Sequence, residues 1–293
     1  GNAFGTRLLF TPGDQSSQYL PGVTTYSPLD YNADLTWEKT TAINLGLDFE
    51  FFKNSILSGS IDVYKRKTND LLSVVPFAPG GTVATQFLKN IGTMDSDGAE
   101  FNLNVKAITT DDLSLTLGGN IAYNISEITN LGDVSALDDT GSGIGGTGTN
   151  LAVNPVGYQP YSAWVFEQLY DANGQPIVEG YKDRNGDGII NNADRHYVAL
   201  RPNWSYGFNM NVNYLNWDLS TSFRGQIGGQ VYNLKKQANG NIQAAIPSQS
   251  TQYVNNVLNF YDGAANPLFN NFNGNGIYSD YLLEDATFLR CDN

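Results

Sequence analysis

Six stretches of the sequence alternate apolar and polar residues, and at their longest they run for about eleven to fourteen residues. In residues 41–52, for example, Ile43, Leu45 and Leu47 fall on one face, and Asn44 and Asp48 fall on the other. Successive side chains of a β-strand point to opposite faces, so this stretch predicts a strand with one apolar and one polar side. Strands of soluble proteins average roughly 5–6 residues, whereas a tilted strand needs roughly 9–11 residues to cross a bilayer. The length therefore predicts membrane-spanning strands.

The other five alternating stretches are residues 57–63, 99–107, 113–126, 204–214 and 217–227. Their apolar faces carry residues such as Phe101, Leu115 and Phe208. In a soluble sandwich this face would pack against a second sheet, so the alternation alone is compatible with either architecture. Strand length favours an all-β, antiparallel transmembrane β-barrel in which lipid contacts the apolar face.

Composition excludes several other classes of protein. The chain has 293 residues and a formal net charge of -13, which argues against nucleic acid as a partner because phosphate binding needs a basic surface. The sequence has no apolar stretch of 18 residues, so a helical membrane protein is excluded. One cysteine, Cys291, rules out an internal disulfide framework, and one histidine, His196, rules out a multi-histidine metal site.

Short and long connections alternate between the predicted strands. The short connections are residues 53–55, 108–112 and 215–216, and the long ones are 68–96, 127–202 and 228–283. Outer-membrane barrels have short periplasmic turns and long extracellular loops, so the long segments are predicted to be extracellular. Asn173 and Gly174 predict a hairpin within 127–202, and the glycine-rich residues 141–149 predict a mobile surface loop. Aromatic residues near the strand ends favour an interfacial girdle.

Residues 183–194 (DRNGDGIINNAD) have the spacing of a calcium-binding loop. The six candidate ligands offer side-chain oxygens or a backbone carbonyl, and they are Asp183, Asn185, Asp187, Ile189, Asn191 and Asp194. Gly188 occupies the position at which the backbone must turn sharply. Asp194 stands where the EF-hand has glutamate, and a tight Asx turn that binds no metal is the alternative. We expect a structural rather than a catalytic Ca²⁺.

Several segments, in order along the chain, resemble the SusC/RagA family of TonB-dependent outer-membrane transporters of Bacteroidetes. The matching segments are LTWEKTTAINLGL (35–47), DFEFF (48–52), LSGSID (57–62), YKRKTNDLL (64–72), NIGTM (90–94), GAEF (98–101), DRNGDGII (183–190), FRGQIGGQVYN (223–233) and EDATFLR (284–290). The resemblance covers most of the chain from Leu35 onward and corresponds to the later part of the barrel.

The resemblance implies that residues 1–293 are part of a 22-stranded barrel in the bacterial outer membrane. The plug domain and the segment that contacts TonB would then lie upstream of Gly1. Residues 127–202 would be a large extracellular loop with the hairpin and the calcium loop, and 228–283 a second long extracellular loop. A SusD-like surface lipoprotein would be the partner, and oligosaccharides or peptides the substrates.

Loop aromatics are the candidate substrate contacts: Tyr158, Tyr161, Trp164, Tyr232 and Tyr253. They could stack on sugar rings or peptide side chains, hold the loops together, or face the SusD-like partner. The sequence offers no catalytic nucleophile with a base, so we expect no enzyme, and an outer-membrane hydrolase is the weakest candidate. A secreted β-rich glycan-binding or adhesive protein, with its apolar faces stacked inward, is the main competing hypothesis. A passive porin is a third.

Overall fold

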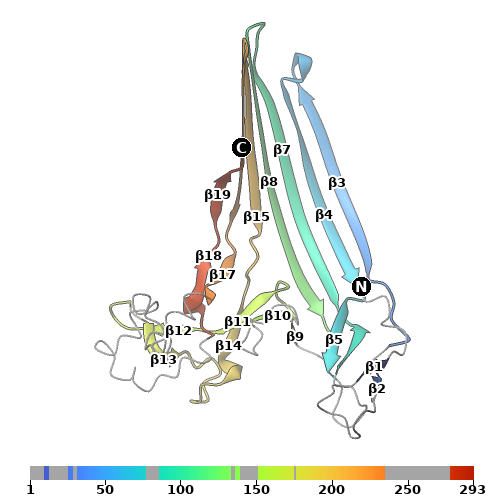
Figure 1. Cartoon of the computed structure of the whole chain (residues 1–293), viewed down its shortest axis with the longest axis vertical. Coiled ribbons are helices and arrows are strands. Elements are labelled where there is room, and N and C mark those ends of the chain that lie inside the picture. Colours follow the sequence, from blue (N-terminus) through green and yellow to red (C-terminus); the bar gives the residue numbers. More distant parts are fainter. Residues whose placement is uncertain are drawn as a thin grey trace.

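The structure is a computed structural model that describes residues 10–12, 26–28, 32–76, 86–132, 136–138, 151–174, 176–234 and 278–293. Its largest element is a seven-stranded antiparallel sheet in the order β19-β16-β15-β8-β7-β4-β3 (Figure 1). The strands are β3 (Lys39–Phe51), β4 (Leu57–Asn69), β7 (Thr93–Thr109), β8 (Leu113–Asn130), β15 (Trp204–Tyr214), β16 (Trp217–Ile227) and β19 (Phe288–Cys291). All six alternating stretches of the sequence lie in this sheet. Within the described residues, no helix combines the length and the apolar character needed to cross a membrane.

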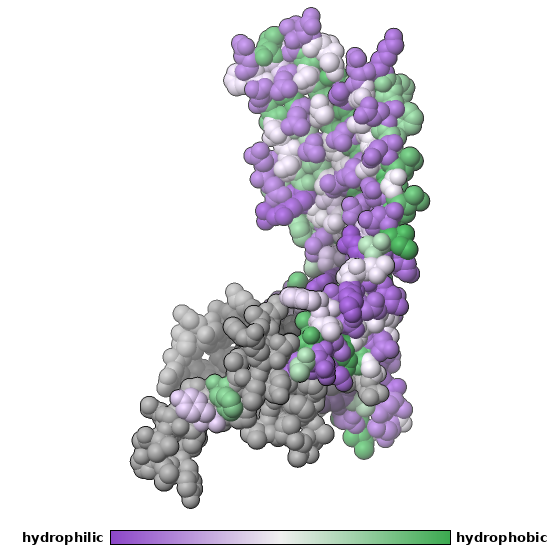
Figure 2. Space-filling model, turned by 90° about the vertical axis from the view of Figure 1, so that its right-hand side faces the viewer, coloured by the Kyte–Doolittle hydropathy of each residue, from purple (hydrophilic) through white to green (hydrophobic). Residues whose placement is uncertain are grey.

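The pairing register aligns the apolar sides of neighbouring strands. Leu45 of β3 lies opposite Val63, Val63 opposite Ala99, Ala99 opposite Tyr123, and Tyr123 opposite Trp204. Side chains alternate along each strand, so one side of the sheet, called the outward face below, is mainly apolar and carries charged residues such as Lys65 and Asp97 at the end near Asn69 and Thr93. Hydrophobic residues gather along one margin of the strand-rich part in Figure 2. The predicted alternation is therefore confirmed.

The outward face is not the inside of a packed core. Leu45 is 72% exposed, Phe208 is 44% exposed and Phe101 is 37% exposed, while Leu115 is half-buried. A two-sheet sandwich would bury these side chains, so the sandwich hypothesis is wrong. An apolar surface of this size on long strands is what a lipid-facing wall presents.

Three strands are longer than predicted, and one of them is β4, which continues to Asn69 where the sequence predicted 57–63. β7 begins at Thr93 and β8 continues to Asn130, whereas the sequence predicted 99–107 and 113–126. The added residues at this end are mostly polar and show little alternation, but they pair across these two strands, with a register shift between Thr93 and Met94. β7 also continues to Thr109, with a register shift between Lys106 and Ile108, so its turn is shorter than the predicted 108–112.

Short turns occupy one end of the sheet and long connections the other (Figure 1). The short turns are η2 (Lys53–Ser55), residues 110–112 and residues 215–216. The opposite end, called the long-connection end below, carries the hairpin of β5 (Leu72–Pro76) and β6 (Gln86–Asn90) and most of the described residues between 130 and 204. This arrangement matches the alternation predicted from connection lengths. A separate two-stranded pair, β1 (Phe10–Pro12) and β2 (Tyr26–Pro28), precedes β3.

A small sheet at the long-connection end, called the cap sheet, contains most of the buried core of the described residues. Its order is β14-β11-β10-β9, from β9 (Ala136–Asp138), β10 (Ala152–Pro155), β11 (Ser162–Phe166) and β14 (Arg195–Val198). The fully buried Ala163 and Val165 pack there with Leu151 and Tyr278. Beside it lie the hairpin of β12 (Gln168–Tyr170) and β13 (Pro176–Tyr181), and η3 (Asn192–Asp194).

The returning chain joins this cap sheet. β17 (Gln230–Tyr232) pairs with β18 (Leu283–Asp285), and η7 (Asp280–Leu282) precedes β18. Ser279 forms a parallel bridge with Phe166, and the Phe166 N–H donates to the carbonyl of Tyr278 at 2.7 Å. The long segments 127–202 and 228–283 are thus packed together at their described parts. The glycine-rich residues 141–149 lie outside the described residues.

Candidate functional site

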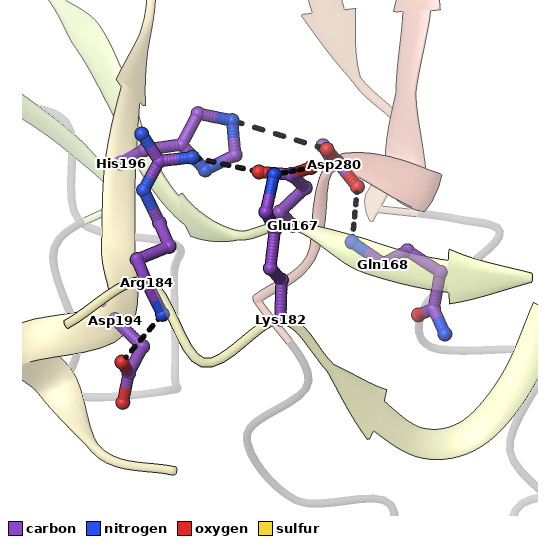
Figure 3. Close-up of polar contacts among 7 residues, drawn as sticks. All are labelled: Glu167, Gln168, Lys182, Arg184, Asp194, His196 and Asp280. Carbon is purple, nitrogen blue, oxygen red and sulfur yellow. Dashed lines mark hydrogen bonds and ion pairs between the residues drawn. The ribbon is translucent and has the colours of Figure 1, made fainter. Parts of the chain in front are cut away.

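A cluster of charged side chains joins Glu167, just before the β12–β13 hairpin, to Lys182 and Arg184, just after it. Glu167 accepts a hydrogen bond from Lys182 Nζ at 2.8 Å and another from Arg184 Nη1 at 2.6 Å (Figure 3). The hydrogen bond from Lys182, with the positive charge of both partners, holds the pKa of Glu167 below its ordinary value. These side chains are partly exposed, so the pairs organise the cluster more than they stabilise the fold.

Two buried groups link the hairpin to the returning chain. The Gln168 side chain is 5% exposed, and its Nε2 donates to the carbonyls of Leu169, Ile177 and Gly180 at 3.1, 2.7 and 3.1 Å. The Gln168 backbone N–H donates to Asp280 Oδ1 at 2.9 Å. This one amide group therefore bonds backbone carbonyls of both hairpin strands, β12 and β13.

His196 approaches the same carboxylate from β14. Its Nε2 lies 3.9 Å from Asp280 Oδ2, and its buried Nδ1 has no hydrogen-bond partner in the described part of the chain (Figure 3). Burial raises the pKa of Asp280, because the charged form loses hydration there. Asp280 thus lies between the hairpin and the cap sheet, in contact with both.

The Asp-rich loop folds around its own backbone. Asp183 accepts from the N–H groups of Gly186 and Gly188 at 2.7 and 2.8 Å, and Asn185 accepts from that of Asp187 at 3.0 Å. Asp187 accepts from the Ile189 N–H at 2.8 Å. Gly186 and Gly188 have φ angles of 75° and 78°, which only glycine adopts without strain. This is the Asx-turn geometry that the sequence allowed as the alternative to a metal site.

The end of the loop is closed by a buried carboxylate. Asp194 is fully buried, and its two oxygens accept from the N–H groups of Asn191 at 2.8 Å and Arg184 at 3.0 Å. The hydrogen bond from the Asn191 N–H, together with further backbone donors, lowers the pKa of Asp194. Asn191 in turn caps η3 through Ala193 N–H at 2.8 Å, and its Nδ2 donates to the carbonyl of Ile189 at 3.2 Å.

The Asp-rich loop offers only part of the ligand shell of a cation. Among the residues that the structure describes, no three acidic, histidine or cysteine side chains gather closely enough to hold a metal ion. The oxygens of Asp183 and Asp187 each accept one N–H and keep further lone pairs, so amide and carbonyl oxygens would have to complete the shell.

Three of the predicted aromatic contacts lie close together in sequence, and each has a partner from β14 or the residues after it. Tyr158 packs on Tyr197 with ring centroids 4.9 Å apart. The guanidinium of Arg201 lies 4.5 Å from the ring of Tyr161, and that of Arg195 lies 4.7 Å from the ring of Trp164. Tyr158 is 45% exposed and Tyr161 is 40% exposed, so both rings remain available to a ligand.

Arg195 was not predicted from the sequence, although it organises this aromatic surface. Its guanidinium also lies 4.8 Å from the ring of Phe166 and 5.3 Å from that of Tyr278. Cation–π contacts of this kind stabilise a desolvated guanidinium. Burial lowers the pKa of Arg195, and the surrounding tyrosines oppose this shift. The position of Arg195 opposite Phe166 depends on the β11–β14 pairing, which the sequence did not predict.

The remaining two predicted contacts are not brought to this surface. Tyr232 pairs with Leu283 in the β17–β18 ladder and packs against the buried cluster of the cap sheet, so its position is that of a structural residue. Tyr253 lies outside the described residues.

The polar face of the large sheet is rich in amides rather than in paired charges. Asparagines of β7, β8 and β15 line it, namely Asn102, Asn104, Asn120, Asn124, Asn209, Asn211 and Asn213. Several are fixed by neighbours, such as Asn102 by Ser60 at 3.2 Å and Asn213 by Ser114 at 3.0 Å. Primary amides both donate and accept hydrogen bonds, so this wall suits a hydrated or hydroxyl-rich solute.

Sequence comparison assigns the family. The family model described as "TonB dependent receptor-like, beta-barrel" matches residues 4–234. The TonB-dependent receptor SusC of Bacteroides thetaiotaomicron is 37% identical over 305 aligned residues, which cover 100% of this chain and 29% of SusC. The TonB-dependent receptor P26 of Formosa agariphila is 33% identical, over 70% of this chain and 22% of P26.

Solved structures share the fold. The RagAB peptide transporter matches 98% of this chain and 31% of the matched chain, with a TM-score of 0.70 and 21% identity. The RagAB peptide importer in its open-open state matches 99% of the chain, again with a TM-score of 0.70. The chain thus spans about 22–31% of the length of these relatives. It belongs to the TonB-dependent receptor β-barrel family, and it is part of an outer-membrane protein.

Proposed function

We propose that this chain is the later part of the barrel of an energised nutrient importer. The observation that carries the proposal is the 37% identity to SusC across the whole chain. The long strands, the lipid-facing outward face and the polar inner wall support it, because a solute channel needs a wet face within an apolar exterior. TonB would supply the energy, and we assign binding and transport to the protein without catalysis.

A SusD-like surface lipoprotein is the proposed partner. The long-connection end supports this assignment, because the cap sheet and the returning chain form one packed body there. Tyr158 and Tyr161 remain exposed on it. A partner that closes this end would trap substrate against the aromatic and arginine side chains.

Oligosaccharides are the proposed substrates, with peptides as the second candidate. Exposed tyrosines beside guanidinium groups suit sugar rings, which present one apolar face and a rim of hydroxyls. The asparagines of the inner wall can both donate to and accept from such hydroxyls. Peptides remain a candidate because RagAB, which shares the fold, is a peptide transporter.

Growth assays in a deletion strain test the proposal. The intact receptor should restore growth on one or more defined oligosaccharides supplied as sole carbon source, and not on tryptic peptides. Tyr158→Ala with Tyr161→Ala should slow uptake, whereas Tyr170→Ala, which removes a 49% exposed tyrosine on the hairpin, should not. Restoration on peptides alone selects the second candidate. Restoration on neither refutes the importer assignment.

We also propose that the Asp-rich loop binds Ca²⁺ through Asp183, Asn185, Asp187, Ile189, Asn191 and Asp194. The ligand spacing and the two left-handed glycines support this proposal. Calcium should co-purify with the receptor, and EGTA should speed tryptic cleavage within 127–202. Asp183→Ala with Asp187→Ala should mimic chelation, and Asp171→Ala, in the neighbouring hairpin turn, should not. Unchanged calcium content and cleavage in the double variant would leave the Asx turn as the explanation.

A further inference from the structure

The outward face contains a groove of about 480 Å³ near the long-connection end. Its apolar walls come from β3, β4, β7 and β8, and are Ile43, Leu45, Val63, Ala99 and Tyr123. Lys65 and Asp97 stand at the end nearest the long connections. The groove therefore has an apolar floor and a charged end.

A small residue creates the groove. Along the cross-strand row from Leu45 to Trp204, Ala99 is the smallest side chain and lies between Val63 and Tyr123. Tyr123 packs against Trp204 on its other side, with ring centroids 4.8 Å apart. No large side chain of the row covers Ala99, so the space beside it is open to the hydrocarbon of the membrane.

The charged end carries two lysines on one side of β4. Lys65 and Lys67 follow Val63 at the strand period of two, so both lie on the outward face, about 7 Å apart along the strand. The Lys65 ammonium is 3.6 Å from Asp97, which is too far for a strong hydrogen bond. Lys67 is exposed and forms no ion pair within the described residues.

Lys39 on the neighbouring strand β3 provides a comparison with a closely paired lysine. Lys39, at the edge of β3, is held by Asp70 at 3.1 Å and has a hydrogen-bonded partner. Lys65, whose ion pair with Asp97 is longer, and Lys67, which lies opposite Asp95 in the register, keep ammonium donors available at the charged end of the groove. Ammonium groups at this depth attract anionic headgroups, and a hydrocarbon groove accepts an acyl chain.

We propose that this groove binds one membrane lipid with a phosphate headgroup. The acyl chain would lie over Ala99 between Val63 and Tyr123, and the phosphate would contact Lys65 and Lys67. The inference rests on the lipid-facing position of the outward face and not on the proposed import activity, so transport and lipid binding can fail independently.

Native mass spectrometry of the intact receptor in non-ionic detergent tests the site. Dioleoylphosphatidate is the probe, and dioleoylglycerol, with the same acyl chains and no phosphate, is the matched control lipid. Ala99→Phe fills the groove, and Val212→Phe enlarges an outward residue elsewhere on the same face. Lys65→Gln with Lys67→Gln removes the charges, and Lys106→Gln removes a lysine from the opposite end of β7. Retained heat-modifiable migration in electrophoresis shows that each variant is folded.

The receptor should bind one phosphatidate more tightly than the diacylglycerol. Ala99→Phe should weaken phosphatidate binding about tenfold, as expected from the loss of about two methylene contacts. The lysine double variant should weaken it about thirtyfold, from two charges near the phosphate, and leave the diacylglycerol unaffected. Val212→Phe and Lys106→Gln should match the parent. Equal binding of the two lipids, or parental phosphatidate binding in either test variant, overturns the proposal.

Discussion

Replacement of Leu117 by arginine tests the orientation of the whole sheet. Leu117 lies on the outward face of β8, opposite Val105 on one side and Met210 on the other. It stands four residues from Leu113, where β8 begins, which is about 13 Å along the strand. A tilt of roughly 40° converts this to about 10 Å of depth in an apolar band of roughly 25 Å. Leu117 is therefore close to the middle of the bilayer.

At that depth an arginine on the lipid face costs about 2–4 kcal/mol of unfolding free energy. Tyr214→Arg provides a depth control, because Tyr214 lies beside the short turn, where the cost falls to about 0–1 kcal/mol. Thr116→Arg provides a face control, because this neighbour of Leu117 lies on the polar side of the same strand. Only Leu117→Arg should be strongly destabilising.

Guanidinium titration of the intact receptor in lipid vesicles, followed by tryptophan fluorescence, measures these free energies. The denaturant slope must stay constant across the variants for the values to be compared. If Leu117→Arg costs no more than Thr116→Arg, the outward face does not contact lipid. If Tyr214→Arg costs as much as Leu117→Arg, the strands do not cross the bilayer at the inferred depth.

Three further outcomes are expected. Gly98→Leu should cost about 1–3 kcal/mol of unfolding free energy, because the Tyr64 ring already occupies the space of a new side chain. Gly119→Leu should be nearly neutral in the same titration, because a Cβ there meets only the Gly207 carbonyl oxygen, 3.6 Å away. Gln168→Ala should speed amide exchange across 168–181 by leaving three carbonyls without their donor, and unchanged exchange would contradict that role. The pKa of Glu167 is lower in the folded state than its unfolded value of about 4.3, so the charged side chain stabilises the fold above that pH. This stabilisation is lost as the pH falls through the folded-state pKa, and proteolysis of the hairpin should therefore rise below about pH 4. Glu167→Gln should remove that pH dependence.

The strands and their faces could be predicted because their periodicity is written in adjacent residues. Leu45 and Phe208 fall on the outward face for the same local reason, the two-residue repeat of a strand. The ends of the strands could not be predicted in the same way. Thr93 and Asn130 belong to strands because they pair with each other at the open end of the β7–β8 hairpin, and neither carries an alternation signal.

The candidate ligand surface was only partly predictable. Tyr158, Tyr161 and Trp164 stand out in sequence as loop aromatics, but their partners Tyr197, Arg201 and Arg195 come from a different segment. Those contacts depend on the pairing of β11 with β14, whose four-residue ladder has no local sequence signal. Tyr232 shows the opposite case, because an equally prominent aromatic packs into the core instead.

The hydrogen bond between Gln168 and Asp280 joins two residues that are 112 positions apart in the sequence. Contacts of such sequence separation are entropically expensive to form early, whereas the hairpins of the large sheet join neighbouring segments. The hairpins β3–β4, β7–β8 and β15–β16 should consequently form before the two outer segments meet. Acquisition of protease resistance around Asp280 would then report a late step of biogenesis, after β15 and β16 in between have paired.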